Sequence, residues 1–359
     1  MIDGAYSRCE QCPRACGADR TTGAHGFCGE RDTLRLATAC LHFGEEPPVT
    51  VWGGSGTIFI TGCTLRCAFC QNYQISQQGM GSPVSETDFV RLCHDLQSMG
   101  AENINIVTGS HHIPLLARYI AAAKLAGLQI PVAWNSSAYE DTGQLEQLCG
   151  LVDIWLPDLK TLNPSMSKRL FAAEDYPAVA TRAIEWMLMH SRLVLKDVPE
   201  PSLHCSGGLC GSAAGSEKHL DKADRGAASR EKMLSGVIVR HLFLPGQFED
   251  TALTLDWLKQ HVDARGCVSL MSQYTPVPFA EPPGAAAARA LALGAIENRL
   301  VSATEDADLR DLIAAYDFSY LFYQELNDDT SWLPDFTQTQ PFSNSLATPV
   351  WCWRHGFLT

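Results

Sequence analysis

The stretch Cys63-Thr-Leu-Arg-Cys67-Ala-Phe-Cys70 directly follows the apolar run Thr57-Ile-Phe-Ile-Thr61. Three cysteines separated by three and then two residues can direct three thiolates to one point from a single loop. Structural zinc sites fill all four coordination positions with protein ligands, whereas sites that carry out chemistry keep one position open. Thiolates at this spacing suit zinc or an iron–sulfur cluster. The stretch therefore predicts a metal centre with an open coordination position, just past a strand.

The rest of the chain alternates predicted strands with predicted helices. Ser85, with Asp88 three residues later, forms a capping-box pattern that begins one helix. A long helix is predicted from about Ser165 to Met189. The predicted strands are the runs 57–61, 103–108, 131–136, 151–157, 236–246 and 267–271. Because strands separated by helices indicate βαβ units on a parallel sheet, the sequence predicts an α/β fold.

Charge and composition limit the classes of partner. The 359 residues include 40 acidic and 27 basic side chains, a net charge of −13. This disfavours nucleic-acid binding, which needs clustered Lys and Arg. No apolar run approaches the roughly 20 residues of a membrane helix, and the amino terminus lacks the layout of a signal peptide. We therefore expect a cytoplasmic protein with no membrane and no nucleic-acid partner, whose 14 cysteines are reduced and in part bind metal.

A second cysteine group has the pattern Cys9-x2-Cys12-x3-Cys16-x11-Cys28. Proline and glycine residues interrupt it, which favours ligand-bearing turns over a helix. Four cysteines within twenty residues suit a tetrahedral zinc site or an iron–sulfur cluster, and the spacing does not decide between them. By contrast, Cys93 falls on the apolar face of the helix that begins at Ser85 and is predicted to be a core residue.

The first cysteine stretch, with Phe69 before its last cysteine, resembles the cluster loop of the radical S-adenosylmethionine (SAM) enzymes. In that superfamily three cysteines, here Cys63, Cys67 and Cys70, hold a [4Fe-4S] cluster, and SAM chelates the fourth iron. The amino-terminal cysteines and the segment Trp332-Leu-Pro-Asp-Phe336 also look like a branch of unassigned function related to pyruvate formate-lyase activating enzyme. The resemblance implies a partial (β/α)6 barrel with SAM across the carboxyl ends of its strands.

The same resemblance implies which residues bind the cofactors. Relatives in the activating-enzyme group place Gly-Gly-Glu after the second strand, where its carboxylate meets the SAM amino group, but this chain has Thr108-Gly109-Ser110 and lacks that carboxylate. Asp158-Leu-Lys160 matches the family's Asp-Leu-Lys, and Lys160 is expected to pair with the SAM carboxylate. No catalytic residue is assigned beyond the cluster and SAM. The expected cofactor-binding residues are Phe69, Gly109, Ser110, Asn135, Ser137, Asp158, Lys160, Arg240 and His241.

Three segments are expected along the chain. Residues 1–50 form the Cys-rich metal-binding module, residues 51–275 the barrel, and residues 276–359 a carboxyl-terminal extension that packs on it. A flexible insertion interrupts the barrel at about residues 204–232, because its Gly-, Ser- and Ala-rich composition has too few large apolar side chains to offset the entropy of ordering.

The resemblance implies an enzyme that reductively cleaves SAM to a 5′-deoxyadenosyl radical, which abstracts a hydrogen atom from a substrate. One candidate role is activation of a glycyl-radical enzyme, with a protein or peptide as the substrate. A second candidate is modification of a small molecule or a ribosomal peptide, and a third, of another class, is a noncatalytic metal-binding redox or scaffold protein. The implied electron donor is a flavodoxin or a ferredoxin-like protein.

Overall fold

The computed structural model describes residues 4–200, 229–327, 330, 332–343 and 345–358. Twelve strands among these residues form one sheet, in the order β10-β9-β8-β6-β5-β4-β2-β1-β11-β12. Of the two strands outside this order, β3 pairs with β1 and β7 pairs with β8. Strands β2, β4, β5, β6, β8 and β9 pair in parallel along this path. Their bounds are Ser55–Ile60, Ile104–Val107, Val132–Ser136, Ile154–Pro157, Ser229–Leu242 and Cys267–Met271.

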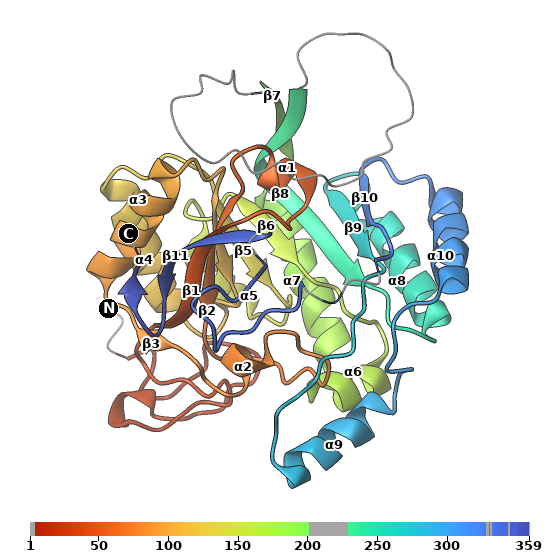
Figure 1. Cartoon of the computed structure of the whole chain (residues 1–359), viewed down its shortest axis with the longest axis horizontal. Helices are drawn as coiled ribbons and strands as arrows, with labels where there is room; N and C mark the ends of the chain where they lie inside the picture. Colours follow the sequence, from red (N-terminus) through yellow and green to blue (C-terminus); the bar gives the residue numbers. More distant parts are fainter. Residues whose placement is uncertain (1–3, 201–228, 328–329, 331, 344, 359) are drawn as a thin grey trace.

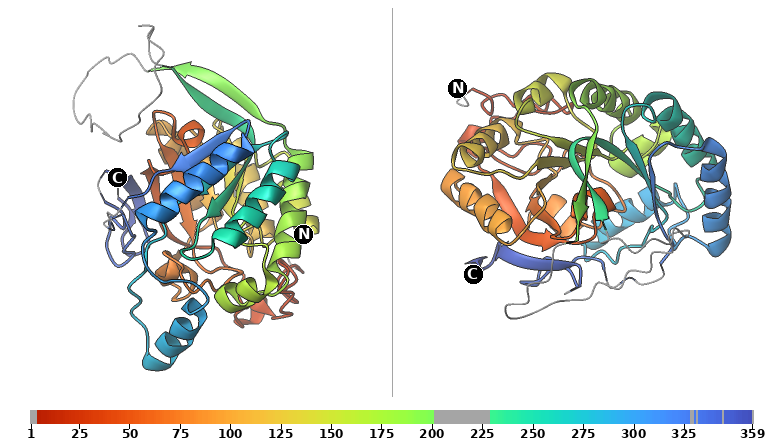
Figure 2. Two further views of the ribbon diagram at one scale, coloured as in Figure 1. Left: turned by 90° about the vertical axis from the view of Figure 1, so that its right-hand side faces the viewer. Right: turned by 90° about the horizontal axis from the view of Figure 1, so that it is seen from above.

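Helices connect these strands and cover the outer side of the curved sheet (Figures 1 and 2). Parallel neighbours need such crossovers because the chain must return to the same end of the sheet before each new strand. The bounds of the helices are α3 Glu86–Ser98, α4 Ile113–Leu125, α5 Thr142–Leu145, the 3-10 helix η2 Glu146–Leu148, α6 Pro164–Phe171, α7 Tyr176–His190 and α8 Phe248–His261. The predicted α/β partial barrel is confirmed.

The start of α3 follows from its sequence. The Ser85 side chain accepts from the backbone N of Asp88, and the Asp88 side chain accepts from the backbone N of Ser85, which forms the predicted capping box. The helix buries one face that includes Cys93, so its predicted core position is confirmed. Gly100, with a φ of +91°, follows the helix in a left-handed conformation.

The predicted long helix from Ser165 to Met189 is wrong, because two helices occupy this stretch. Helix α6 ends at Ala172, which adopts a left-handed conformation with φ +56° and ψ +36°. Pro177 lies in the first turn of α7, where the missing N–H costs no helical hydrogen bond. In a continuous helix the ring of Pro177 would clash with the carbonyl of Ala173, so the chain must break between the two helices.

The two ends of the chain add strands at both edges of the barrel sheet: the amino-terminal segment adds one beside β2, and the carboxyl-terminal segment adds strands at either edge. Strand β1 (Arg35–His42) runs antiparallel to β2 and also pairs with β11 (Ala347–Cys352) and β3 (Ser82–Pro83). Strand β10 (Leu321–Gln324) pairs in parallel with β9. The remaining elements of the ends are the 3-10 helix η1 (Arg20–Thr22), β12 (Gly356–Phe357), α9 (Pro283–Leu293) and α10 (Ala303–Tyr316). The amino-terminal and carboxyl-terminal segments therefore extend the sheet at its edges.

Strand β7 (Val194–Pro199) pairs antiparallel with the first half of β8. The insertion predicted at about residues 204–232 lies mostly outside the described residues, but residues 229–232 form the start of β8, where Arg230 pairs with Val198. Strand β8 therefore begins a few residues earlier than the composition suggested, because these residues extend the hairpin ladder.

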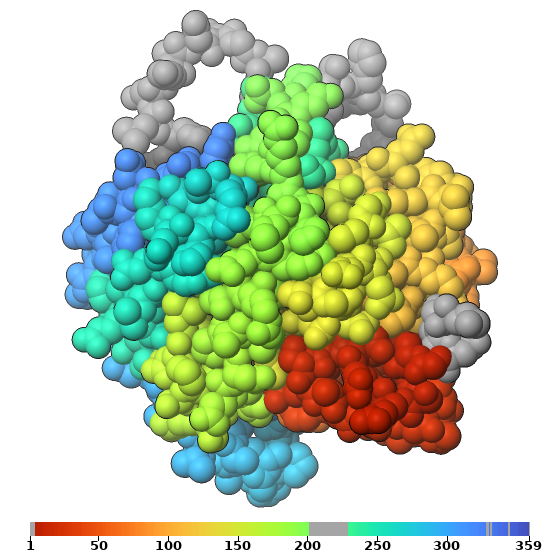
Figure 3. Space-filling view, turned by 180° about the vertical axis from the view of Figure 1, so that it is seen from behind, coloured from red at the N-terminus to blue at the C-terminus, as the bar shows by residue number. Residues whose placement is uncertain are grey.

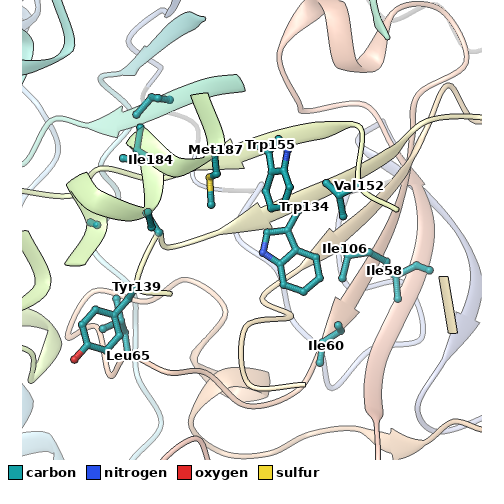
Figure 4. Packing of buried hydrophobic residues seen from close by; sticks show 14 of the residues in the cluster. Ile58, Ile60, Leu65, Ile106, Trp134, Tyr139, Val152, Trp155, Ile184 and Met187 are labelled. Carbon is teal, nitrogen blue, oxygen red and sulfur yellow. The ribbon is translucent and has the colours of Figure 1, made fainter. Parts of the chain in front are cut away.

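The core has an outer and an inner layer, since neighbouring residues of a strand point to opposite faces. Outward side chains such as Trp134 and Trp155 belong to one cluster with Ile184 and Met187 of α7, and Ile58 lies at the other side of this cluster, beside Ile106 (Figure 4). The inner layer at the amino ends of the strands is apolar and includes Val49 of the short helix α1 (Pro47–Thr50) together with Ala133, Ile154, Leu156, Ile238 and Cys267. Helix α1 therefore fills one end of the barrel, opposite α2 in Figure 1. No helix of the described residues is long and apolar enough to cross a membrane.

Candidate functional site

The loop that carries Cys63, Cys67 and Cys70 leaves the sheet after β2 and runs to the short helix α2 (Tyr73–Ser76). All three cysteines are half-buried. Cys63 Sγ lies 3.4 Å from the backbone N of Leu65, which donates to it, and Cys70 Sγ lies 3.3 Å from Ser76 Oγ. Cys67 is within electrostatic reach of both other thiols. The loop therefore gathers three thiols beyond the carboxyl end of β2.

The chemistry of this donor set suits an iron–sulfur cluster. Burial raises the pKa of the Cys63 thiol to about 11 and also raises the pKa values of Cys67 and Cys70. Thiols with raised pKa values are protonated at neutral pH until a metal displaces the protons. Within the described part of the chain, no group of three or more His, Cys, Asp or Glu side chains is already arranged to hold a metal ion. The fit rests on three thiol donors on one accessible loop, since thiolates are the usual ligands of such clusters.

Two arginines from distant parts of the chain hold the backbone of this loop. Arg14 Nε donates to the carbonyl of Thr64 at 2.8 Å. Arg289 Nη1 of α9 donates to the carbonyl of Ala68 at 2.9 Å and to that of Cys67 at 3.3 Å. The Arg289 guanidinium also lies over the Phe279 ring, 3.7 Å from its centroid. The amino-terminal and carboxyl-terminal segments thus meet on the loop and restrict its conformation.

A network of half-buried charges lies at the ends of the neighbouring strands. Asp158, which follows β6, accepts from Lys160 Nζ at 2.8 Å and from Arg240 Nε of β8 at 2.9 Å. Arg240 also donates to Asn135 Oδ1 of β5, and its Nη1 lies 3.3 Å from Glu45 Oε2. The structure therefore brings together four of the predicted residues: Asn135, Asp158, Lys160 and Arg240.

Lys160 links this network to the cysteine loop. Its charge acts on each of the three thiols. Burial alone raises the pKa of the Asp158 carboxyl, but Lys160 and Arg240 outweigh burial and hold this pKa below its usual value. Burial likewise opposes the charge of Lys160, but Asp158 reverses the effect and raises the Lys160 pKa. Asp158 and Lys160 are therefore both charged at neutral pH, next to the loop.

Glu45 and Glu46 complete the network from the other end of the barrel. They precede α1, and Glu45 Oε1 accepts from Asn105 Nδ2 of β4 at 3.1 Å. Burial raises the pKa of both carboxyls, and Arg240 opposes that effect. Glu46 Oε2 is buried without a hydrogen-bond partner. Sequence reasoning missed both residues, because two glutamates before Pro47-Pro48 match no motif.

The turn after β4 holds Gly109 and Ser110 close to the core. Gly109 has no room for a side chain, since a Cβ there would lie 2.4 Å from the Trp134 ring. Thr108 adopts φ +64°, a rare conformation for a β-branched residue, which indicates local strain. Ser110 Oγ donates to Glu140 at 2.8 Å, and this buried carboxylate also accepts from Trp134 and Ser136. Glu140, a second residue that sequence reasoning missed, therefore ties the ends of β4 and β5 together.

The other predicted residues lie apart from the charge network. The buried Phe69 packs edge-on against Phe171 and Tyr274, with ring centroids 5.9 Å apart in both pairs. Ser137 is half-buried after the end of β5. His241 is buried on the side of β8 that faces α8, where Nδ1 donates to the Leu159 carbonyl at 2.7 Å and Nε2 accepts from Thr251 Oγ1 at 3.0 Å. His241 therefore lies in the core between β8 and α8, and among the described residues it makes no hydrogen bond to the charge network around Arg240.

We expect His241 to make the protein less stable in acid. Burial lowers the pKa of His241 to about 4, against an ordinary value of 6.5. Between pH 4 and pH 6.5, therefore, His241 is protonated in the unfolded state and neutral in the folded state. Stability from the neutral imidazole is present above pH 6.5 and is lost as the pH falls toward 4. At pH 5 the loss amounts to about 2 kcal/mol.

Urea denaturation of the wild type and His241→Gln at pH 7 and pH 5 measures this effect. The loss of unfolding free energy between the two pH values should be smaller in His241→Gln. The exposed His355, changed to Gln, is the matched control and should leave the loss unchanged. Equal losses in wild type and His241→Gln would contradict the expectation.

A cavity of about 640 Å³ lies away from this site, lined by residues 188–193, 263–266, Ser319 and Tyr320. These residues precede β7, β9 and β10 and therefore lie at the amino ends of the strands. The cysteine loop and the charge network are at the opposite, carboxyl ends, where parallel barrels carry their chemistry. The candidate site is accordingly the group formed by the loop and the network.

Comparisons with known proteins concern both the sequence and the fold. An uncharacterized protein of Methanocaldococcus jannaschii is 26% identical over 279 residues, which cover 76% of this chain and 67% of that protein. The structure of Streptococcus suis SuiB bound to precursor peptide SuiA has a TM-score of 0.45 at 11% identity, and covers 73% of this chain but 46% of SuiB. A domain of pyruvate-formate lyase-activating enzyme from Bacteroides vulgatus has a TM-score of 0.35 at 8% identity, covering 60% of this chain and 92% of that domain.

The chain thus spans less than half the length of SuiB. A family model described as the radical SAM superfamily matches residues 57 to 191 of this sequence. The match includes β2, the cysteine loop and the Asp158-Leu-Lys160 segment. This part of the chain is therefore similar to the radical SAM superfamily.

Proposed function

We propose that this protein reductively cleaves SAM at a [4Fe-4S] cluster held by Cys63, Cys67 and Cys70, and that it uses the product to abstract a hydrogen atom from a substrate. The observation that carries the proposal is the position of three half-buried thiols on one loop next to the Lys160–Asp158 ion pair. The similarity of residues 57–191 to the radical SAM superfamily supports both cofactors. When bound and reduced, the cluster supplies the electron that cleaves SAM.

The protein's own residues supply binding and orientation. Lys160 is charged and close to the thiols, so it can pair with the carboxylate of SAM while Asp158 holds its ammonium group in place. Arg240 fixes Asp158 from the other side and is itself held by Asn135 and Glu45. A preorganised network of this kind places the ligand without reorganising the site at each turnover.

The proposal is tested by adding SAM and a chemical reductant to the anaerobically reconstituted protein. Formation of 5′-deoxyadenosine and methionine in equal amounts is expected, and chromatography measures both. Reactions without the reductant are the control and should give neither product. A protein that holds its cluster and still forms no 5′-deoxyadenosine would favour the noncatalytic redox or scaffold role.

For the substrate we propose a glycine on a partner protein, with a flavodoxin or a ferredoxin-like protein as the electron donor. The support is the likeness of the cysteine module and the Trp332-Leu-Pro-Asp-Phe336 segment to the activating-enzyme branch. Capture of a glycyl-radical enzyme under anaerobic conditions, followed by the appearance of a protein radical on addition of SAM, would support this role. Consumption of a small molecule or a ribosomal peptide instead would favour the second candidate.

Replacing Lys160 by Met is expected to weaken SAM binding roughly 10- to 100-fold, because a charge-assisted hydrogen bond contributes about 1.5–3 kcal/mol. Equilibrium dialysis of radiolabelled SAM with the cluster-loaded protein measures the dissociation constant. Lys168→Met is the matched control, since Lys168 pairs with Glu174 on the surface and both side chains are 64% exposed. If the two variants bind SAM equally well, Lys160 does not contact the ligand.

A further inference from the structure

Arg20 is a fully buried cation in the amino-terminal module. Its guanidinium donates to the carbonyl of Arg31 through Nε at 2.9 Å and to that of His111 through Nη1 at 2.8 Å. It also lies over the Tyr6 ring, 4.6 Å from the centroid, and 3.2 Å from His112 Nε2. None of these groups carries a negative charge.

Within the described residues, no carboxylate forms an ion pair with Arg20. Glu30 acts on Arg20 only at longer range and pairs instead with Arg35, whose Nη1 lies 3.2 Å from Glu30 Oε1. The sulfur nearest to the Arg20 guanidinium is Cys9 Sγ, 3.6 Å from Nη1. An uncompensated charge in a protein interior costs several kcal/mol. A negative charge on Cys9 Sγ would compensate the charge of Arg20.

The other three cysteines of the module gather around the same place. A Cβ on Gly26 would lie 3.2 Å from Cys28 Sγ and 3.6 Å from Cys16 Sγ, so both sulfurs press against one turn of the backbone. Cys16 is within electrostatic reach of Cys9, and Cys12 is within electrostatic reach of the remaining three. Cys9, Cys12 and Cys28 are buried and Cys16 is exposed, which leaves one side open for a metal to enter.

We propose that Cys9, Cys12, Cys16 and Cys28 form a second metal site and that Arg20 is its buried counter-cation. Four thiolates around Zn²⁺, or around an oxidised [4Fe-4S] cluster, carry a net charge of about −2. That charge compensates Arg20, whereas four neutral thiols do not. The shared chemistry is an anionic tetrathiolate centre, and this site does not depend on SAM cleavage at the other loop.

The module is joined directly to the first cysteine loop. Cys63 N donates to the Cys28 carbonyl at 3.4 Å, and Arg66 Nη2 of the same loop donates to the Phe27 carbonyl at 2.9 Å. Arg14 donates to Thr64 and to the carbonyl of Phe171 at 3.2 Å, beside α6. Figure 3 shows the amino-terminal residues in red, packed against the yellow and yellow-green parts of the surface. A metal that fixes residues 27 and 28 therefore also supports the loop.

The test uses the full chain with Cys63, Cys67 and Cys70 all replaced by Ala, so that metal at the second site is measured alone. We expect either about one zinc or about four irons per chain, and elemental analysis with the visible absorption spectrum distinguishes the two. Changing Cys9 and Cys12 to Ala in this background should remove the metal. A folded triple variant without metal would overturn the proposal.

Arg20→Met in the same background isolates the counter-cation. The concentration of chelator that removes half the metal should fall roughly 10- to 100-fold, as for other groups that support metal ligands from outside the coordination sphere. Arg20→Lys keeps the charge and should recover part of this loss. Arg8→Met is the matched control, because Arg8 is 81% exposed in its pair with Glu10.

The direction in which Arg20→Met changes the stability of the metal-free protein distinguishes a counter-cation from a residue that only packs in the core. Without the metal, Arg20→Met removes an uncompensated buried charge and should leave the urea midpoint unchanged or raised. If Arg20→Met retains metal as well as Arg8→Met does, Arg20 is not the counter-cation. Should Arg20→Met fail to fold, the neutral variant Arg20→Gln is compared with Arg8→Gln at the same chelator concentrations, and equal metal retention by the two would overturn the counter-cation role.

Discussion

Replacing any one of Cys63, Cys67 and Cys70 by Ala is expected to abolish the formation of 5′-deoxyadenosine from SAM. Each cysteine supplies one of three thiol donors on a single loop after β2. With one donor removed, two thiolates remain and the cluster loses a protein ligand that the rest of the loop does not replace. The loss should therefore reach the detection limit rather than a modest fold-change.

The measurement compares 5′-deoxyadenosine formed per chain after identical anaerobic reconstitution, with iron content determined on the same samples. Cys149→Ala is the matched control, because Cys149 is exposed and lies between α5 and β6 rather than on the loop. This variant should keep wild-type activity. Full turnover by Cys63→Ala, Cys67→Ala or Cys70→Ala would contradict the assignment of these residues.

Local patterns in the sequence predicted the parts of the fold that depend on neighbouring residues. The alternation of apolar runs with helical periodicity predicted the six parallel strands, since a parallel sheet needs a crossover between each pair. The spacing of Cys63, Cys67 and Cys70 predicted that their thiols share a loop, because the distance along the chain limits how far apart they can lie. The break between α6 and α7 was missed, although Pro177 was a visible signal for it.

The charge network was only half predictable, because its members come from opposite ends of the barrel. Asp158 and Lys160 are two residues apart, and their pairing follows from a recognisable motif. Glu45 is separated from Arg240 by 195 positions in the chain, and only the folded barrel brings the two together. Glu140 was hidden in part for the same reason: Trp134 and Ser136 lie just before it on β5, but its third donor, Ser110, is 30 positions away. Long-range partners of a buried charge leave no local pattern in a single sequence.

Replacing Asp158 by Ala is expected to lower the free energy of unfolding by about 3 kcal/mol or more. Asp158 is the shared partner of Lys160 and Arg240, and its removal leaves Lys160, whose side chain is only 18% exposed, without its ion pair. Breaking a buried pair costs about 3–5 kcal/mol because the remaining charge stays uncompensated. Glu45 still contacts Arg240 at 3.3 Å, so we expect the lower part of this range.

Anaerobic urea denaturation at pH 7, followed by circular dichroism, measures the change. Glu174→Ala is the matched control: it breaks the exposed pair with Lys168, and such pairs contribute only about 0–1 kcal/mol. A loss for Asp158→Ala no larger than that for Glu174→Ala would show that the network adds nothing to the fold.

The pH dependence provides an independent check on the charge of Asp158. Because Lys160 and Arg240 outweigh burial and hold the folded-state pKa of its carboxyl below the ordinary value of 3.8, the ionised group stabilises the folded protein above pH 3.8. That contribution is lost as the pH falls through the folded-state pKa. The stability difference between the wild type and Asp158→Asn should therefore be constant from pH 7 to pH 5 and shrink only in stronger acid. A difference that already disappears at pH 5 would mean that the carboxyl is not held ionised by its two cations.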